Sequence, residues 1–186
     1  MMIKRFNVVS VTAATLLCLL SMSSAQSNTL INARYVDNND GTITDTVTSL
    51  TWQRCSLGQT WLASACNGKA ARYRGEQAIE LVKAGWRLPS IAELDTLVQC
   101  QGERQPDKRT EDEYINRTNA QCLGEPEQPT INTEAFPATA KDWYWSATSH
   151  EESTGSAWRV SFEDGSVYYD NKVYGLGRVR LVRSSE

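Results

Sequence analysis

Alternating apolar and polar residues predict short β-strands in the first third of the chain. The segments Ala33–Asp37, Thr42–Asp45 and Leu50–Arg54 follow this pattern and contain many β-branched and aromatic residues. Between the first two, Asn38–Gly41 predicts a hairpin turn, because an Asp-Gly pair supplies the positive φ that tight hairpins need at glycine. We therefore expect three short strands, the first two joined by a hairpin.

A helical spacing of apolar residues replaces this alternation from Arg74 to Ala84. In this segment Ala78, Ile79 and Val82 fall on one helix face, which predicts that they are buried together. Gly85 is a typical helix terminator and ends the segment.

A second helix is predicted behind the extended segment Trp86–Pro89. Ser90 and Glu93 form the S-x-x-E pattern of a capping box, which marks a helix start. The helix is expected to end near Cys100. Its buried face is expected to consist of Ile91, Leu94 and Val98.

Strand patterns return in the last quarter of the chain. Trp143–Ser146 predicts one strand, and Ala157–Phe162 and Ser166–Asp170 predict two more around the hairpin signal Asp164-Gly165. A final strand at Val179–Val182 is expected to close the sheet. Strands, two helices, a long loop and further strands together predict one α+β domain.

The N-terminal residues 1–25 have the pattern of a secretory signal peptide. Basic residues Lys4–Arg5 precede the mostly apolar run Val8–Leu20, and Ser23–Ala25 provides small residues for cleavage. The run is too short and too rich in Ser and Thr for a stable membrane span, so no span is expected after cleavage. We expect an exported protein in the periplasm, at the cell surface or secreted, which starts with a polar leader at 26–32.

Charge argues against one class of partner. The signal peptide removes two of the nineteen basic residues, which leaves seventeen against twenty-two acidic residues. A net acidic chain without a basic run is not a natural nucleic-acid binder. No nucleic-acid partner is therefore expected.

Four cysteines remain in the predicted mature chain, namely Cys55, Cys66, Cys100 and Cys122. An even number in an exported protein indicates disulfides, and of the three possible pairings we favour the sequence-local Cys55–Cys66 and Cys100–Cys122. A zinc site is the alternative, but the spacing contains no Cys-x-x-Cys pair and the compartment is oxidising. The second bridge would close the base of a charged, apolar-poor insertion at 101–129, which is expected to be a solvated loop.

A set of motifs in fixed order resembles one protein family. The motifs are Arg34–Asp37, Asp40–Asp45, Leu50–Cys55, Trp86–Pro89, Glu93–Leu94, Ile131–Asn132, Ala135–Pro137, Tyr144–Ser146, Phe162, Asp164-Gly165 and Val179–Arg183. Together they are similar to the Lcl C-terminal domain family, named for part of a bacterial collagen-like adhesin, over roughly residues 34–183. The resemblance assigns 33–186 to one such domain.

This resemblance implies a bacterial, exported protein with a C-type-lectin-like fold. In that fold the two ends of the domain pair in one sheet, two helices pack beside it, and a long loop region varies. The adhesin for which the family is named also implies sulfated glycans as a ligand class. Fold similarity does not carry chemistry with it, so each possible site is judged on its own residues.

The residues argue against an enzyme. His150 is the only histidine, so a site with two or three histidine ligands is excluded, and no nucleophile-elbow sequence accompanies it. We expect His150 to be a surface residue in a polar turn, no catalytic group, and no cofactor or metal. Calcium dependence stays open, with the Asp37–Asp45 turn and the insertion as the places to consider, although neither has the EF-hand spacing.

The remaining signal is aromatic and basic. Six tryptophans are present, and Trp52, Trp86 and Trp145 are expected in the core. Exposed aromatic surfaces often mark binding sites, and arginines suit acidic ligands, although pairing of the arginines with Glu163, Asp164 and Asp170 is the structural alternative. The candidate ligand-binding residues are Trp143, Trp158, Tyr168, Tyr169, Arg178 and Arg180.

These residues predict a non-catalytic recognition or adhesion module that binds glycan or another cell-surface polymer. The alternative is a structural or assembly component of the cell envelope that contacts protein partners through the same aromatic surface. The sequence does not indicate an oligomeric state.

Overall fold

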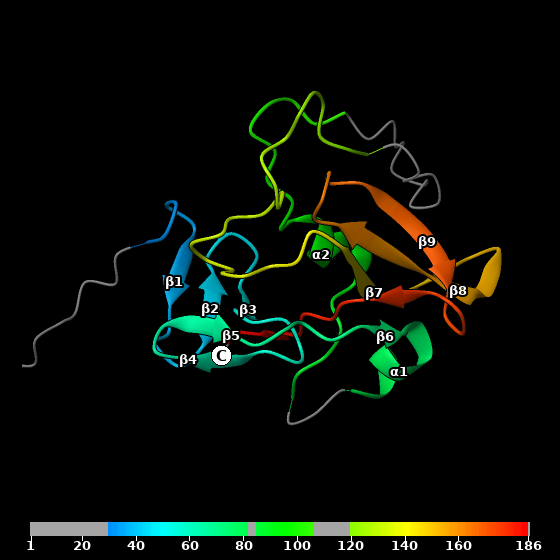
Figure 1. Ribbon diagram of the computed structural model, residues 1–186, viewed down its shortest axis with the longest axis horizontal. Coiled ribbons are helices and arrows are strands. Elements are labelled where there is room, and N and C mark those ends of the chain that lie inside the picture. The colour runs from blue at the N-terminus through cyan, green and yellow to red at the C-terminus, as the bar shows by residue number, and fades with distance from the viewer. Residues whose placement is uncertain (1–29, 82–84, 106–119, 186) are drawn as a thin grey trace, which may run out of the picture.

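The computed structural model describes residues 30–81, 85–105 and 120–185 (Figure 1). The predicted signal peptide, the start of the polar leader, Val82 and residues 106–119 of the 101–129 insertion lie outside these ranges. Within them the protein is α+β, with mostly antiparallel sheets and two short helices. No helix among the described residues is long and apolar enough to cross a membrane.

A four-stranded antiparallel sheet joins the two ends of the domain. It contains β1 (Tyr35–Asp37), β2 (Thr42–Asp45), β3 (Leu50–Gln53) and β11 (Val182–Ser184) in the order β1-β2-β3-β11. The hairpin between β1 and β2 has the expected positive φ of 87° at its glycine. The closing strand was predicted at Val179–Val182 and is displaced toward the C-terminus, since its pairing with β3 begins at Val182. Before it, the carbonyls of Leu181 and Val179 accept the N–H groups of Gln53 and Leu57.

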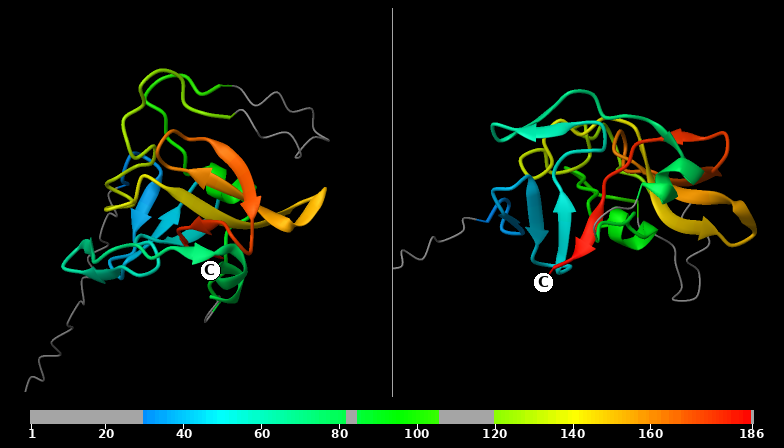
Figure 2. Two further views of the ribbon diagram at one scale, coloured as in Figure 1. Left: turned by 45° about the vertical axis from the view of Figure 1, so that its right-hand side comes forward. Right: turned by 90° about the horizontal axis from the view of Figure 1, so that it is seen from below.

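A three-stranded antiparallel sheet forms the other side of the domain (Figures 1 and 2). It consists of β7 (Trp143–His150), β8 (Ser153–Ser161) and β9 (Val167–Asn171), in that order. The strands β7 and β8 are longer than predicted, since an irregularity after Trp145 lets the pair continue to a second turn. The predicted Asp-Gly turn lies between β8 and β9, with φ of 75° at Gly165.

Two small ribbons complete the strands. β4 (Thr60–Leu62) pairs with β5 (Ala65–Asn67) inside the first disulfide loop, a hairpin that the sequence pattern did not predict. β6 (Tyr73–Arg74) pairs with β10 (Leu176–Gly177) and links the segment before the first helix to the C-terminal part of the chain.

The helices are shorter than predicted. α1 spans Gly75–Glu80 and α2 spans Ile91–Asp95. In α1 only one of the predicted apolar side chains that are described is buried: Ala78 has no exposure, whereas Ile79 is 46% exposed, so its expected burial is wrong. A helix of six residues covers too little surface to bury a full stripe.

The capping box of α2 is confirmed. The Ser90 hydroxyl accepts the Glu93 N–H at 3.2 Å, and the Glu93 carboxylate accepts the Ser90 N–H at 2.7 Å. The Glu93 carboxylate also accepts hydrogen bonds from both terminal nitrogens of Arg87, at 2.7 Å each. The Arg-Leu-Pro motif and its downstream glutamate therefore fix the entry into α2, which is a structural role.

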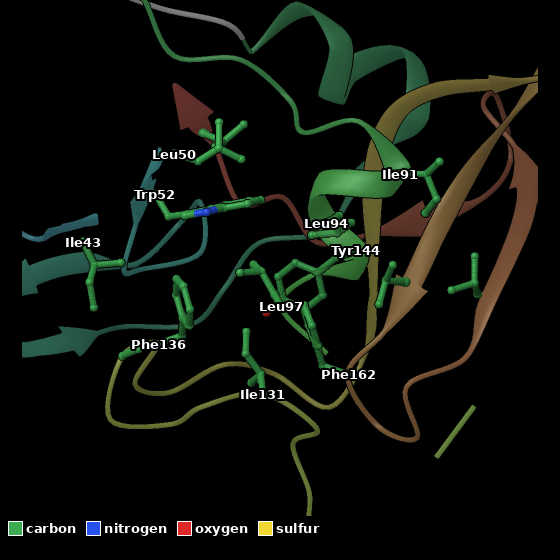
Figure 3. Close-up of a cluster of buried hydrophobic side chains, with 14 of the residues drawn as sticks. Ile43, Leu50, Trp52, Ile91, Leu94, Leu97, Ile131, Phe136, Tyr144 and Phe162 are labelled. Carbon is green, nitrogen blue, oxygen red and sulfur yellow. The ribbon is translucent and has the colours of Figure 1, made fainter. Parts of the chain in front are cut away.

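The main core lies between the two sheets and is closed by α2 (Figure 3). Trp52 from β3, Phe136 from the long loop and Tyr144 from β7 are fully buried there. Their rings point toward one another. A second, smaller cluster packs around Trp145, between β7 and α1. Burial of Trp52 and Trp145 agrees with their expected core role, while Trp86 is only half-buried.

Both predicted disulfides are formed. The S–S distances are 2.09 Å for Cys55–Cys66 and 1.95 Å for Cys100–Cys122, with Cα atoms 5.4 and 5.5 Å apart. The first bridge joins the segment just after β3 to the β4–β5 hairpin. The second bridge joins the two sides of the insertion, and the Cys122 N–H donates to the backbone carbonyl of Asp164 in the turn between β8 and β9.

Candidate functional site

Basic side chains gather where the segment before α1 meets the start of β7. Lys69 and Arg178 line a groove of about 310 Å³, together with small residues that include Ala140. Arg72 lies beside Arg178, and the exposed Lys141 directly follows Ala140. We call this surface, made of Lys69, Arg72, Lys141 and Arg178, the basic groove.

A single carboxylate organises the basic groove. One oxygen of Asp142 accepts from Nε of Arg72 and Nε of Arg178, both at 2.8 Å, and the other accepts the Trp143 N–H at 2.9 Å. Burial alone would raise the pKa of Asp142, but the Trp143 N–H and the two guanidinium groups outweigh it and hold that pKa below its ordinary value. Asp142 therefore stays ionised and neutralises one of the four cations.

The cations remain accessible to a ligand. The side chain of Arg72 is 53% exposed and that of Arg178 is 20% exposed, while Lys69 and Lys141 are exposed. Asp142 carries one negative charge against the two guanidinium groups that it binds, and Lys69 lines the same groove, so the groove is locally positive on a chain whose net charge is −3. It offers a contact site for an anion within short range.

Trp143 stands next to the basic groove. Its carbonyl accepts the Arg178 N–H at 2.7 Å, which ties β7 to the segment after β10. Beneath it, the buried Arg159 guanidinium lies 5.0 Å from the Trp143 ring and 4.9 Å from the Trp145 ring. The half-buried indole of Trp143, which directly follows Asp142 in the chain, is thus held in place by Arg159.

A second groove, which we call the tryptophan groove, lies at the turn of the hairpin between β1 and β2. It has a volume of about 340 Å³, and its walls include Trp61 and Trp86, with Gln53, Gln59 and Asp40 among the polar residues. Both indoles are half-buried. Gln59 also lines the basic groove, so the two grooves share a wall.

The two indoles of the tryptophan groove are fixed by cations and by close packing. The Arg54 guanidinium lies 4.5 Å from the Trp61 ring, and the Arg183 guanidinium 4.9 Å from the Trp86 ring. Trp61 also packs so closely on Gly41 that an added Cβ there would come within 2.6 Å of the indole. Glycine is required at that turn for contact as well as for its positive φ.

The structure divides the sequence-predicted ligand residues. Trp143 and Arg178 lie together at the basic groove, and Tyr168 is 47% exposed on β9. Tyr169 is half-buried and stacks on Tyr168 with ring centroids 4.9 Å apart. Trp158 is only 2% exposed, so its expected place on an open aromatic face is wrong.

His150 packs against Trp158 and is itself buried, so its expected place at the surface is wrong. The strand β7 continues through His150, which pairs with Ser153 rather than forming a polar surface turn. The imidazole is 6% exposed, and its ring centroid lies 4.0 Å from Tyr169 and 5.3 Å from Trp158. This aromatic cluster belongs to the packing of the three-stranded sheet.

Arg180 is also not a surface residue. It is 0% exposed, and its guanidinium donates to the carbonyls of Gln53, at 2.8 Å, and Arg54, and to the Thr139 hydroxyl at 2.8 Å. The face of the Phe136 ring lies 4.8 Å away. Burial lowers the pKa of Arg180. Its expected place at a ligand-binding surface is therefore wrong.

Pairing of arginines with acidic residues holds in one of the expected cases. Arg159 and Asp170 form an ion pair at 2.8 Å, whereas Arg178 pairs with Asp142, which was not among the expected partners. The sequence analysis also missed Lys69, Arg72 and Lys141. A signal was present in the segment Lys-Ala-Ala-Arg-Tyr-Arg at 69–74, which contains three basic residues and no acidic one.

The described residues offer poor ligands for calcium. In the Asp37–Asp45 turn, Asp37 is engaged by Arg54 at 2.5 Å and Asp45 by Arg34 at 2.6 Å. A third groove of about 380 Å³ contains two carboxylates, Glu127 and Glu134, among amide side chains. Across the described ranges, no group of three or more His, Cys, Asp or Glu side chains is placed to hold a metal ion.

The comparison with known families agrees with this architecture. The family model of the Lcl C-terminal domain matches residues 41–183, so the chain belongs to the Lcl C-terminal domain family. No curated protein and no solved structure gives a significant match. The match covers both grooves apart from Asp40, and it covers both disulfides.

Proposed function

We propose that the protein is an exported, non-catalytic recognition or adhesion module that binds an acidic glycan or another polyanionic surface polymer at the basic groove. The observation that carries this function is the groove lined by Lys69 and Arg178, beside which Arg72 shares the Asp142 carboxylate with Arg178 and the exposed Lys141 precedes Asp142 in the chain. The half-buried Trp143, which follows Asp142, adds a flat apolar surface of the kind that sugar rings and other partners contact.

Export and a C-type-lectin-like architecture fit this role. Two disulfides stabilise the described part of the domain, as is usual for proteins that work in an oxidising compartment. Pairing of β11 with β3, two short helices and a long loop segment between α2 and β7 are the features expected of that fold. A binding role also needs no reactive group, and the four cysteines of the mature chain are bridged while His150 is buried.

Binding at the basic groove must act at short range. The chain is net acidic, so at physiological ionic strength it repels a polyanion weakly until the two surfaces come within about 8 Å, the screening length. Contact with the guanidinium and ammonium groups then provides charge-assisted hydrogen bonds. The affinity should therefore fall steeply as salt is raised.

A panel of acidic and neutral glycans tests this function, with binding measured at low and physiological salt. We expect the double variant Lys69→Gln/Arg72→Gln to weaken binding of acidic glycans roughly tenfold, equivalent to about 1.4 kcal/mol. The matched control is Lys69→Arg/Arg72→Lys, which preserves both charges and should retain most of the affinity. The proposal would be contradicted if the wild-type protein bound no acidic glycan, or if the double variant bound acidic glycans as tightly as wild type.

A second candidate function is assembly with a protein partner of the envelope. It is favoured by exposed apolar side chains on and after β9, where Tyr168, Tyr174 and Leu176 are 47%, 82% and 48% exposed. A glycan panel without binding, combined with co-purification of one envelope protein that Tyr174→Ser abolishes, would favour this candidate over the first.

A further inference from the structure

The tryptophan groove differs from the basic groove in charge. Asp40 is the one charged residue among its lining residues, and no lysine or arginine lines it. One oxygen of Asp40 accepts the Thr42 N–H at 2.8 Å and the Thr42 hydroxyl at 2.6 Å, which fixes the carboxylate at the edge of the groove. The groove lacks a lining cation that would bind an anionic group, so it suits an uncharged ligand.

Its walls suit one side of a sugar ring. Trp61 and Trp86 supply flat apolar surfaces, and each is backed by an arginine that restricts the ring. Between them lie hydroxyl and amide groups that can bond to sugar hydroxyls, including the side chain of Gln53. The volume of about 340 Å³ lies near the lower end of the range for small-molecule sites, about 300–1,000 Å³.

The shared wall connects the two grooves. Gln59 lines both of them, and its amide is fixed at both ends, since its oxygen accepts the Ser56 N–H at 3.0 Å and its nitrogen donates to the Ala138 carbonyl at 3.2 Å. A rigid side chain at the junction allows one extended ligand to lie across both grooves. The cationic surface of the basic groove then adjoins the aromatic surface of the tryptophan groove, which has no lining cation.

We propose that the tryptophan groove is a second subsite that binds the apolar face of an uncharged sugar unit, next to the acidic unit held by the basic groove. This inference rests on the proposed function, and it narrows the polyanion to an acidic polysaccharide rather than a polymer without sugar rings. Affinity should then depend on ring contacts as well as on charge.

The test compares polyanions with and without sugar rings. Fragments of hyaluronan, alginate and polygalacturonate of graded length are titrated against the full chain, with inorganic polyphosphate of equal charge as the ringless probe. We expect hyaluronan, which alternates an acidic with an uncharged sugar unit, to bind about ten times more tightly than polyphosphate and to change the tryptophan fluorescence, and alginate and polygalacturonate, in which every unit is acidic, to bind more weakly than hyaluronan. Equal binding of all polysaccharides and polyphosphate would overturn the inference.

Variants separate the two subsites. Trp86→Ala should lose about tenfold in affinity for the preferred polysaccharide and less than twofold for polyphosphate, whereas Lys69→Gln/Arg72→Gln should weaken both ligands. Because Trp86 is partly packed against the core, Gln53→Ala provides a milder change with the same expected pattern and a loss of about threefold. Gln99→Ala, which removes an amide from the groove that contains Glu127, is its control and should have no effect.

The outcomes distinguish the inference from the function on which it rests. Loss of polysaccharide and polyphosphate binding to the same extent in Trp86→Ala and Gln53→Ala would refute the subsite and leave the basic groove intact. Failure of wild type to bind any of the polyanions, or binding that the basic-groove variant does not change, would refute the proposed function itself.

Discussion

Replacing Arg180 by methionine removes a buried cation while keeping an unbranched side chain of similar length. The guanidinium donates to the carbonyls of Gln53 and Arg54 and to the hydroxyls of Ser56, at 3.3 Å, and Thr139, at 2.8 Å. The two hydroxyls can rotate to other partners, but the two carbonyls are fixed by the backbone. The substitution therefore leaves two buried acceptors without this donor.

The expected magnitude follows from these two carbonyls. A buried acceptor that loses its partner costs about 1–3 kcal/mol, so the loss lies between about 2 and 6 kcal/mol. Removal of the charge recovers part of this, because burying a cation carries a desolvation cost of its own. We expect a net loss of about 3 kcal/mol in the free energy of unfolding, or a melting temperature lower by about 6–12 °C for a domain of this size.

The assay is thermal and urea unfolding followed by circular dichroism, with the disulfides intact. Arg183→Met is the matched control: it removes an arginine from the same segment whose side chain stacks on Trp86 at the surface. The control should change the unfolding free energy by less than about 1 kcal/mol. If Arg180→Met were as stable as wild type or more so, the buried cation would be a net liability and its carbonyl contacts would not hold the core together.

Three further outcomes are expected. Reduction of both disulfides should lower the melting temperature markedly, because each bridge contributes about 2–4 kcal/mol; an unchanged transition would show that the bridges are irrelevant. Ser90→Ala should cost about 1 kcal/mol in urea unfolding through loss of the helix cap, and an unchanged midpoint would refute this role. Arg87 holds the pKa of Glu93 below its ordinary value of 4.5, so stability should be constant above that pH and fall below it; Glu93→Gln should flatten this fall, and an unaltered pH profile would contradict the linkage.

Local sequence signals predicted the elements that depend on local chemistry. Thr42–Asp45 was predicted to the residue, because alternation and the Asp-Gly turn both fix it. The Ser90 capping box and the two sequence-local disulfides were likewise correct. In each case the determining partners lie close together along the chain, so tertiary packing had little to override.

The errors lie where distant segments decide burial. Alternation correctly places Trp143 and Trp145 on one face of β7, since both contact Arg159, but it does not tell which face is covered. Trp158 is covered by His150 and Tyr169, so it is buried instead of exposed. Arg180, which precedes β11, is buried because it is enclosed by Gln53, Arg54 and Thr139. No local sequence pattern predicts the burial of these two side chains, because the residues that cover them come from other parts of the chain.

The candidate site was predicted only in part for the same reason. Trp143 and Arg178 were selected from sequence, yet Lys69 and Arg72 lie about a hundred positions before Arg178. Arg72 meets Arg178 through Asp142, and Lys69 lines the same groove. The tryptophan groove is assembled from the β1–β2 turn, the first disulfide loop and the segment before α2. Its members share no spacing that a sequence pattern could reveal.

The pairing of β11 with β3 has a consequence for how the protein is made. The Thr51 hydroxyl bonds to that of Ser185, 134 positions later, so the first sheet acquires its fourth strand only after nearly the whole domain has been synthesised. Nascent chains therefore lack this strand until synthesis of the domain is almost complete, and they are expected to fold slowly. Removal of a few residues around Val182 would leave an open sheet edge and a polypeptide prone to aggregate or to be degraded.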